Sequence, residues 1–151
     1  GQKRTVSVSL TVDTDAYTVN DIVGGKLTLT SAARTSGGAG VILGVALVDM
    51  SMQDAEYDII IFEQDPTNGT YTDDAAIDVD DTDADFLVGV ITVSPGHYTD
   101  FTDNSVATVN NVNLPFTAVG SANLYAVAVT RGTPTYAAAT DLQLRFKIAQ
   151  D

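Results

Sequence analysis

The chain has 151 residues, with 7 basic and 20 acidic side chains, a formal net charge of −13 and no cysteine. This length fits one domain, which buries roughly 70% of its unfolded surface and needs no disulfide. The negative charge argues against general nucleic-acid binding, and no apolar run reaches the roughly 18 residues of a membrane-spanning helix.

Short β-strands separated by turns account for most of the sequence. Thr5–Val12 alternates valine or leucine with serine or threonine, which predicts a half-buried strand. Gly1–Thr5, at its start, is expected to form an N-terminal arm. Further strands are predicted at Val23–Thr30, Val41–Val48, Ile59–Phe62, Phe86–Ser94, Ser105–Val109, Val112–Thr117, Asn123–Thr130 and Asp141–Ala149.

The stretch Gly40–Glu63 is the expected centre of the fold. Val41–Val48 is too continuously apolar for a strand with one solvent-exposed face, so we expect it to be buried on both sides. Gly40 and Gly44 interrupt it, and a glycine inside a strand often marks a bulge or a close backbone approach. Gly24–Gly25 likewise suggests a bulge or bend at the start of Val23–Thr30. Ile59–Phe62 is the second buried strand, and the two are expected to pair antiparallel.

These elements predict an all-β fold in which residues 1–151 form one antiparallel two-sheet sandwich. The length and the uneven loops favour a jelly roll, with an immunoglobulin-like sandwich second because that fold is usually near 100 residues. The expected core residues are Val6, Val8, Leu10, Leu27, Leu29, Val45, Leu47, Ile59, Ile61, Val90, Leu142, Leu144 and Phe146.

An acidic segment, Asp73–Asp85, contains seven aspartates. Closely spaced carboxylates can bind calcium, although the helix–loop–helix calcium motif fails here because its glycine and glutamate positions are Asp83 and Gly89. The alternative is a solvated acidic loop. Within it, Thr82–Phe86 is expected to form one helical turn capped by Thr82.

The residue types give little support to catalysis. His97 is the one histidine, and no G-x-S-x-G nucleophile motif is present. A histidine-rich metal site is therefore not expected, and we predict no catalytic, cofactor-binding or metal-binding residue. The paired carboxylates of a glycosidase stay open as an alternative. The six tyrosines suit either half-buried core edges or exposed contacts to sugars.

Four segments carry a resemblance to a known family. They are GGKLTLTSAARTSGG (residues 24–38), GVILGVALVD (40–49), DNSVAT (103–108) and LYAVAVTRGTPTYAAATDLQLRF (124–146). In these segments the chain resembles small virion structural proteins of tailed bacteriophages, in particular the capsid cement or decoration proteins. The amino-acid sequences of these motifs are unusual, and they contain no set of catalytic residues.

The resemblance implies a non-enzymatic protein that binds the major capsid protein on the outer surface of the virion and stabilises the head. Assembly would take place in the cytoplasm of the bacterial host. The alternative within the same resemblance is a head-fibre or tail-associated domain that binds a glycan or receptor. Such a domain would carry an exposed aromatic cluster.

The few cations near the two ends of the chain predict how it would bind. Lys3 and Arg4 precede the first strand, and Arg145 and Lys147 lie on the polar side of the last. If these strands are neighbours, the four residues form a basic patch that touches the capsid. We also expect a homo-oligomer, a dimer or trimer, with Ser105–Thr117 and Gly1–Thr5 as candidate segments for exchange.

Overall fold

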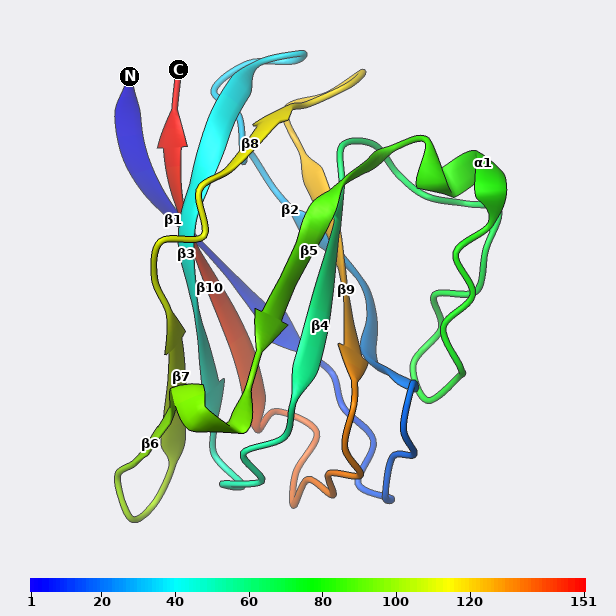
Figure 1. Ribbon diagram of the computed structural model, residues 1–151, viewed down its shortest axis with the longest axis vertical. Helices are drawn as coiled ribbons and strands as arrows, with labels where there is room; N and C mark the ends of the chain where they lie inside the picture. Colours follow the sequence, from blue (N-terminus) through cyan, green and yellow to red (C-terminus); the bar gives the residue numbers. More distant parts are fainter.

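Two antiparallel sheets face each other in the computed structural model, which describes residues 1–151 and confirms the predicted β-sandwich (Figure 1). One sheet has six strands: β1 (Gln2–Leu10), β3 (Ala39–Asp49), β6 (Tyr98–Asp100), β7 (Ser105–Val109), β8 (Leu114–Thr117) and β10 (Leu142–Gln150). The other has four: β2 (Ile22–Leu29), β4 (Tyr57–Phe62), β5 (Leu87–Val93) and β9 (Leu124–Thr130). The remaining elements are the helix α1 (Asp81–Ala84) and the 3₁₀ turn η1 (Pro95–His97). Neither has the length that a helix needs to cross a bilayer.

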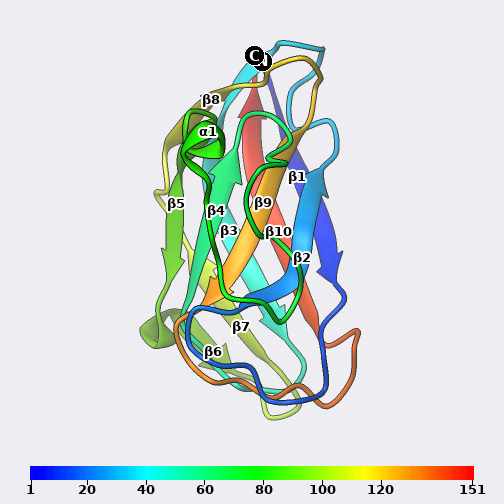
Figure 2. The same cartoon turned by 90° about the vertical axis from the view of Figure 1, so that its right-hand side faces the viewer.

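The order of strands shows how often the chain changes sheets. The six-stranded sheet runs β1-β10-β3-β7-β6, with β8 also on β3, and the four-stranded sheet runs β2-β9-β4-β5. Between β1 and β4 every connection crosses to the opposite sheet. The first and last strands are neighbours, so the two termini lie side by side at one end of the molecule (Figures 1 and 2).

The predicted pairing of the two central apolar strands is wrong. Val41–Val48 lies in β3, which pairs with β10, β7 and β8, whereas Ile59–Phe62 lies in β4, which pairs with β9 and β5. The connection from Met50 to Glu56 carries the chain across the core instead of closing a hairpin. Both strands are central, as expected, but each in its own sheet.

The main core lies between the sheets and follows the predicted alternation closely in β10. Leu142, Leu144, Phe146 and Ile148 are at most 1% exposed. The core predictions are confirmed for Val6, Leu10, Leu27, Leu29, Val45, Leu47, Ile59, Ile61, Leu142, Leu144 and Phe146. Val8 is half-buried and packs against this core.

Val90 was wrongly predicted to be in the core, since it is 55% exposed. Ile91 and Val93, which have the opposite parity along β5, face inward, so Val90 points out of the sheet. The run Phe86–Val93 is apolar without alternation, and its pairing with β4 shifts between Gly89 and Leu87. The residue pattern therefore carried no signal for which side of β5 would be buried.

A second apolar cluster covers the outer face of the four-stranded sheet. Ile60, Val127 and Val129 point away from the main core and are buried under the segment from residue 64 to 86, which Figures 1 and 2 show lying across this face. Tyr71 from that segment completes the cluster. This layer explains why β4 is buried on both of its faces, as its continuous apolar sequence predicted.

The expected N-terminal arm does not exist as a separate segment. Gln2–Thr5 belongs to β1 and pairs in register with Lys147–Gln150 of β10. Bulges lie at two of the predicted glycine sites: the β2–β9 register shifts between Ile22 and Lys26, around Gly24–Gly25, and the β3–β10 register shifts next to Gly44. At Gly40 the pairing with Gln150 is regular.

Candidate interaction surface

The predicted cations meet on the outer face of the six-stranded sheet because β1 and β10 are neighbours. Thr5 lies opposite Lys147 and Ser7 opposite Arg145. The core side chains of both strands have the other parity, so Lys3, Arg145 and Lys147 share the solvent side of the sheet. We call this surface of β1, β10 and β3 the basic face.

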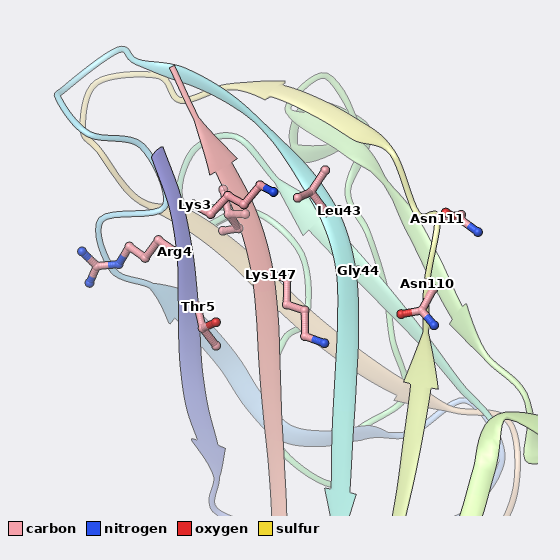
Figure 3. Close-up of a pocket in the computed structure, with 9 residues that line it drawn as sticks. Lys3, Arg4, Thr5, Leu43, Gly44, Asn110, Asn111 and Lys147 are labelled. Carbon is pink, nitrogen blue, oxygen red and sulfur yellow. The ribbon is translucent and has the colours of Figure 1, made fainter. Parts of the chain in front are cut away.

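Arg4 lines the hollow described below, but its side chain does not share the solvent side of the sheet with Lys3, Arg145 and Lys147. It has the same parity as Val6, a core residue, but is itself exposed near the start of β1. Figure 3 shows its side chain pointing away from those of Lys3 and Lys147. Alternation along a strand separates two cations that are adjacent in sequence.

A hollow of about 460 Å³ lies within the basic face, lined by Lys3, Thr5 and Lys147 on one side and Asn110 on the other. The side chains of Lys3 and Lys147 extend toward β3, and that of Asn110 approaches from β7 (Figure 3). Ammonium, amide and hydroxyl groups in this arrangement suit a carboxylate, with which lysine forms charge-assisted hydrogen bonds.

The backbone of β3 creates this hollow. The register with β10 jumps from Gly44 to Ile42, which leaves Leu43 as a bulge. On the other side of β3, β7 pairs only up to Val45 and β8 pairs from Ile42 onward. Between these two pairings the Val112 N–H donates to the Leu43 carbonyl oxygen over 3.0 Å. A Cβ at Gly44 would lie 2.9 Å from the Val109 carbonyl oxygen, so glycine both permits this crossing and leaves the floor of the hollow bare.

The strands of the basic face carry no exposed acidic residue, although the chain has a net charge of −13; Asp151, which follows β10, lies beside Lys3 at the end of the face. β1, β7, β8 and β10 contain no aspartate or glutamate, and the acid that ends β3, Asp49, is fully buried. The two ion pairs, Lys26–Asp65 and Arg131–Asp58, lie on the side of the four-stranded sheet. Three unpaired cations are therefore concentrated on one surface.

Asp83 in the acidic segment has an internal structural role. Its buried carboxylate accepts hydrogen bonds from the N–H groups of Thr67, Asn68 and Gly69, the side-chain amide of Asn68 and the hydroxyl of Tyr71. Burial by itself raises the pKa of Asp83, but the hydrogen bonds from Tyr71, Asn68 and Gly69 outweigh it, so the pKa is lowered.

Other acids of the segment also bind the chain itself. Asp73 accepts from the Tyr17 hydroxyl over 2.9 Å and from the Gly24 N–H over 2.7 Å. Asp80, not Thr82, caps the one-turn helix by accepting from the Thr82 N–H. No three aspartate, glutamate or histidine side chains converge as metal ligands would, so the geometry gives no support to a calcium site.

His97 caps a turn. Its Nδ1 accepts from the Ser94 N–H over 2.9 Å and closes the 3₁₀ turn that follows Pro95. None of the six tyrosines is strongly exposed. Tyr17, Tyr57, Tyr71 and Tyr136 are buried, and Tyr98 and Tyr125 are half-buried. The exposed aromatic cluster of a sugar-binding surface is absent.

Sequence reasoning missed the residues around the cations. Thr5, Leu43, Asn110 and Asn111 line the hollow but lie in three separate parts of the chain. The one available signal was Asn110–Asn111 between two short predicted strands, since asparagine tolerates the left-handed backbone that Asn111 adopts at φ 58°.

Comparisons with known proteins identify no relative: no protein-family model and no curated protein matches the chain.

Proposed function

We propose that the chain is a non-enzymatic structural protein that docks through its basic face on the outer shell of a bacteriophage capsid, as a cement or decoration protein. The observation that carries the proposal is the basic face itself. In a protein with 20 acidic side chains, three unpaired cations lie on one sheet surface whose strands carry no exposed acid. The resemblance to tailed-phage virion proteins supplies the partner, the major capsid protein.

The basic face suits docking against an acidic protein surface. Complementary charge orients the partners and speeds association, while lasting affinity needs a buried area of roughly 1,200 Å² or more. Small side chains flank Arg145 across the sheet, with Ser7 on β1 and Ala46 on β3, so a partner surface can approach closely. Repetition over a shell would add avidity to each contact.

The strand order supports a jelly-roll connection. Four strands in the order β1-β10-β3-β7 face four in the order β2-β9-β4-β5, and β1 pairs antiparallel with the last strand. We interpret this as the two interlocked Greek keys of a jelly roll, an architecture found in viral capsid and lectin domains. The architecture alone does not assign a function.

The fibre or tail alternative has less support. A glycan-binding or receptor-binding tip would present exposed aromatic side chains, whereas four of the six tyrosines are buried and Phe101 is the one strongly exposed aromatic residue, at 58%. The net charge of −13 also fits a position outside the shell better than contact with packaged DNA. The outer surface of the virion is therefore the proposed location.

The test is a binding assay on capsids prepared without the protein. Reversing the basic face with Lys3→Glu, Arg145→Glu and Lys147→Glu should slow association by about tenfold or more and abolish its dependence on salt. Arg34→Glu is the matched control, because Arg34 is exposed outside this face and the substitution changes the charge by the same amount per site. This control should bind like the parent.

Two results would contradict the proposal. One is equal loss of binding in the control variant and the basic-face variant, which would indicate a response to net charge alone. The other is a variant with Asp78, Asp80 and Asp81 changed to asparagine that fails to bind while the basic-face variant binds normally. That outcome would mean that the acidic segment faces the shell.

A further inference from the structure

β5 is an edge strand with one free side. It pairs only with β4, and no other backbone or side-chain group of the chain forms a hydrogen bond with the backbone of Leu87–Val93. In Figure 2 it lies at one edge of the four-stranded sheet, opposite β2. Unpaired N–H and C=O groups on such an edge are a template for another strand.

The other four edge strands carry features that oppose pairing. β8, which pairs only with β3, is four residues long and contains Pro115. β1 carries Lys3 and Arg4, and charged residues on an edge disfavour strand addition. β2 is bulged at its glycines, where the Gly24 N–H already donates to Asp73. β6 has three residues and ends at Asp100. Each of these edges is short, charged or distorted.

β5 has no charge and no proline, and it is rich in β-branched residues (LVGVITV). Leu87 is 40% and Val90 55% exposed. Asp58 on the adjacent strand is already engaged, because Arg131 forms an ion pair with it and the Thr92 hydroxyl donates to it. On a chain of net charge −13, this edge is a place where two copies can meet without bringing free carboxylates together.

We propose that two copies of the chain form a two-fold dimer by antiparallel pairing of β5 with β5. The regular part of the strand is Gly89–Val93, because the register with β4 shifts at Val88. A two-fold axis at Ile91 pairs Val90 with the partner's Thr92 and joins the two four-stranded sheets into one. A single free edge per copy closes the assembly at two.

The dimer has a consequence for the basic face. Paired residues in antiparallel strands point to the same side of a sheet, so the two-fold axis is perpendicular to the joined sheet. Both six-stranded sheets then lie on its same side, and their basic faces point toward one surface. Bivalent docking rests on the proposed function, whereas the β5 pairing does not.

Sedimentation velocity over a range of micromolar concentrations tests the pairing on the full chain. The parent should move from 15.8 kDa toward twice that mass as its concentration rises. Val90→Lys should remain at 15.8 kDa, with a dissociation constant raised by about tenfold or more, since a lysine on the edge opposes pairing. Val19→Lys is the matched control, because Val19 is 52% exposed in a loop and the charge change is the same.

A second measurement identifies the strand involved. Amide hydrogen exchange of Val90 and Thr92 should slow as the parent dimerises, while that of Ser7 on β1 should not change. A parent that stays monomeric at about 100 μM, a trimer, open-ended aggregation, or a Val90→Lys variant that dimerises like the parent would overturn the inference. A monomeric Val90→Lys variant that still binds capsids would leave the proposed function intact.

Discussion

Asp83 offers the sharpest test of what holds the outer layer of the sandwich together. Its carboxylate accepts from the N–H groups of Asn68 and Gly69, both at 2.9 Å, and from the Tyr71 hydroxyl at 2.6 Å. Tyr71 in turn packs edge-on against Phe62 of β4, with ring centroids 5.7 Å apart. One buried side chain therefore connects the acidic segment to the sheet beneath it.

The change to examine is Asp83→Asn, which keeps the shape of the side chain and one acceptor oxygen. The retained oxygen can keep the three donors of Oδ2, which are the N–H groups of Asn68 and Gly69 and the Tyr71 hydroxyl. The NH₂ group that replaces Oδ1 then meets the Thr67 N–H and the Asn68 side-chain amide, so about two hydrogen bonds are lost. Each buried donor left without an acceptor costs about 1–3 kcal/mol, which gives roughly 2–6 kcal/mol in total. If residues 64 to 86 unfold locally while the two sheets stay folded, the donors regain water. The free energy of that local unfolding is therefore an upper limit to the loss of stability.

The pH dependence follows from the lowered pKa of Asp83. Because the pKa in the folded state lies below the unfolded value of about 3.9, the carboxylate stabilises the fold above that pH. This stabilisation is lost as the pH falls through the folded-state pKa. The amide introduced by Asp83→Asn does not titrate, so the difference in stability between the parent and this variant should be full at pH 7 and shrink below about pH 4.

Urea denaturation at pH 7 and at acid pH measures both effects, with tyrosine fluorescence and far-UV dichroism as probes. Asp81→Asn is the matched control, because Asp81 is exposed two residues away and the substitution removes the same charge. It should change stability by less than about 0.5 kcal/mol. An Asp83→Asn variant as stable as the parent at pH 7, or a difference that does not shrink on acidification, would refute the reasoning.

Two further predictions concern packing and backbone. Phe146→Ala should lower the free energy of unfolding, measured by urea denaturation, by about 3–5 kcal/mol, because Phe146 is fully buried. Lys147→Ala next to it should be nearly neutral. Equal losses in the two variants would mean that the inward and outward sides of β10 are assigned wrongly. Gly24→Ala should cost clearly more than Gly37→Ala, because both glycines have positive φ but only at Gly24 would the new Cβ meet Leu10, at 2.7 Å. Equal losses would mean that Leu10 moves aside freely.

The sequence alone determined the strands and much of the core. The alternation in Thr5–Val12 and Asp141–Ala149 located β1 and β10 to within a few residues and identified their inward sides, because a strand repeats every two residues. The glycines located two bulges. The sequence also shows that the cations near both ends of the chain are separated from the acids, since the strands that contain them have no aspartate or glutamate.

Pairing was decided by the tertiary structure. β3 and β4 are both apolar, and nothing in either sequence says which strand lies beside which; the loop between them crosses to the other sheet. Contacts between residues far apart in the chain settle such choices, and they depend on how all strands fit together. For the same reason Val90, in a run without alternation, was placed on the wrong side.

The basic face shows both contributions at once. That Lys3 and Arg4 lie near Arg145 and Lys147 depends on the pairing of β1 with β10, which the sequence could only suppose. Alternation along β1 then places Lys3 on the face and Arg4 off it, once Gln2–Thr5 is known to be strand and not a free arm. The hollow required the bulge in β3 and the crossing after β7, two features distant in sequence that meet only when the sheet is assembled.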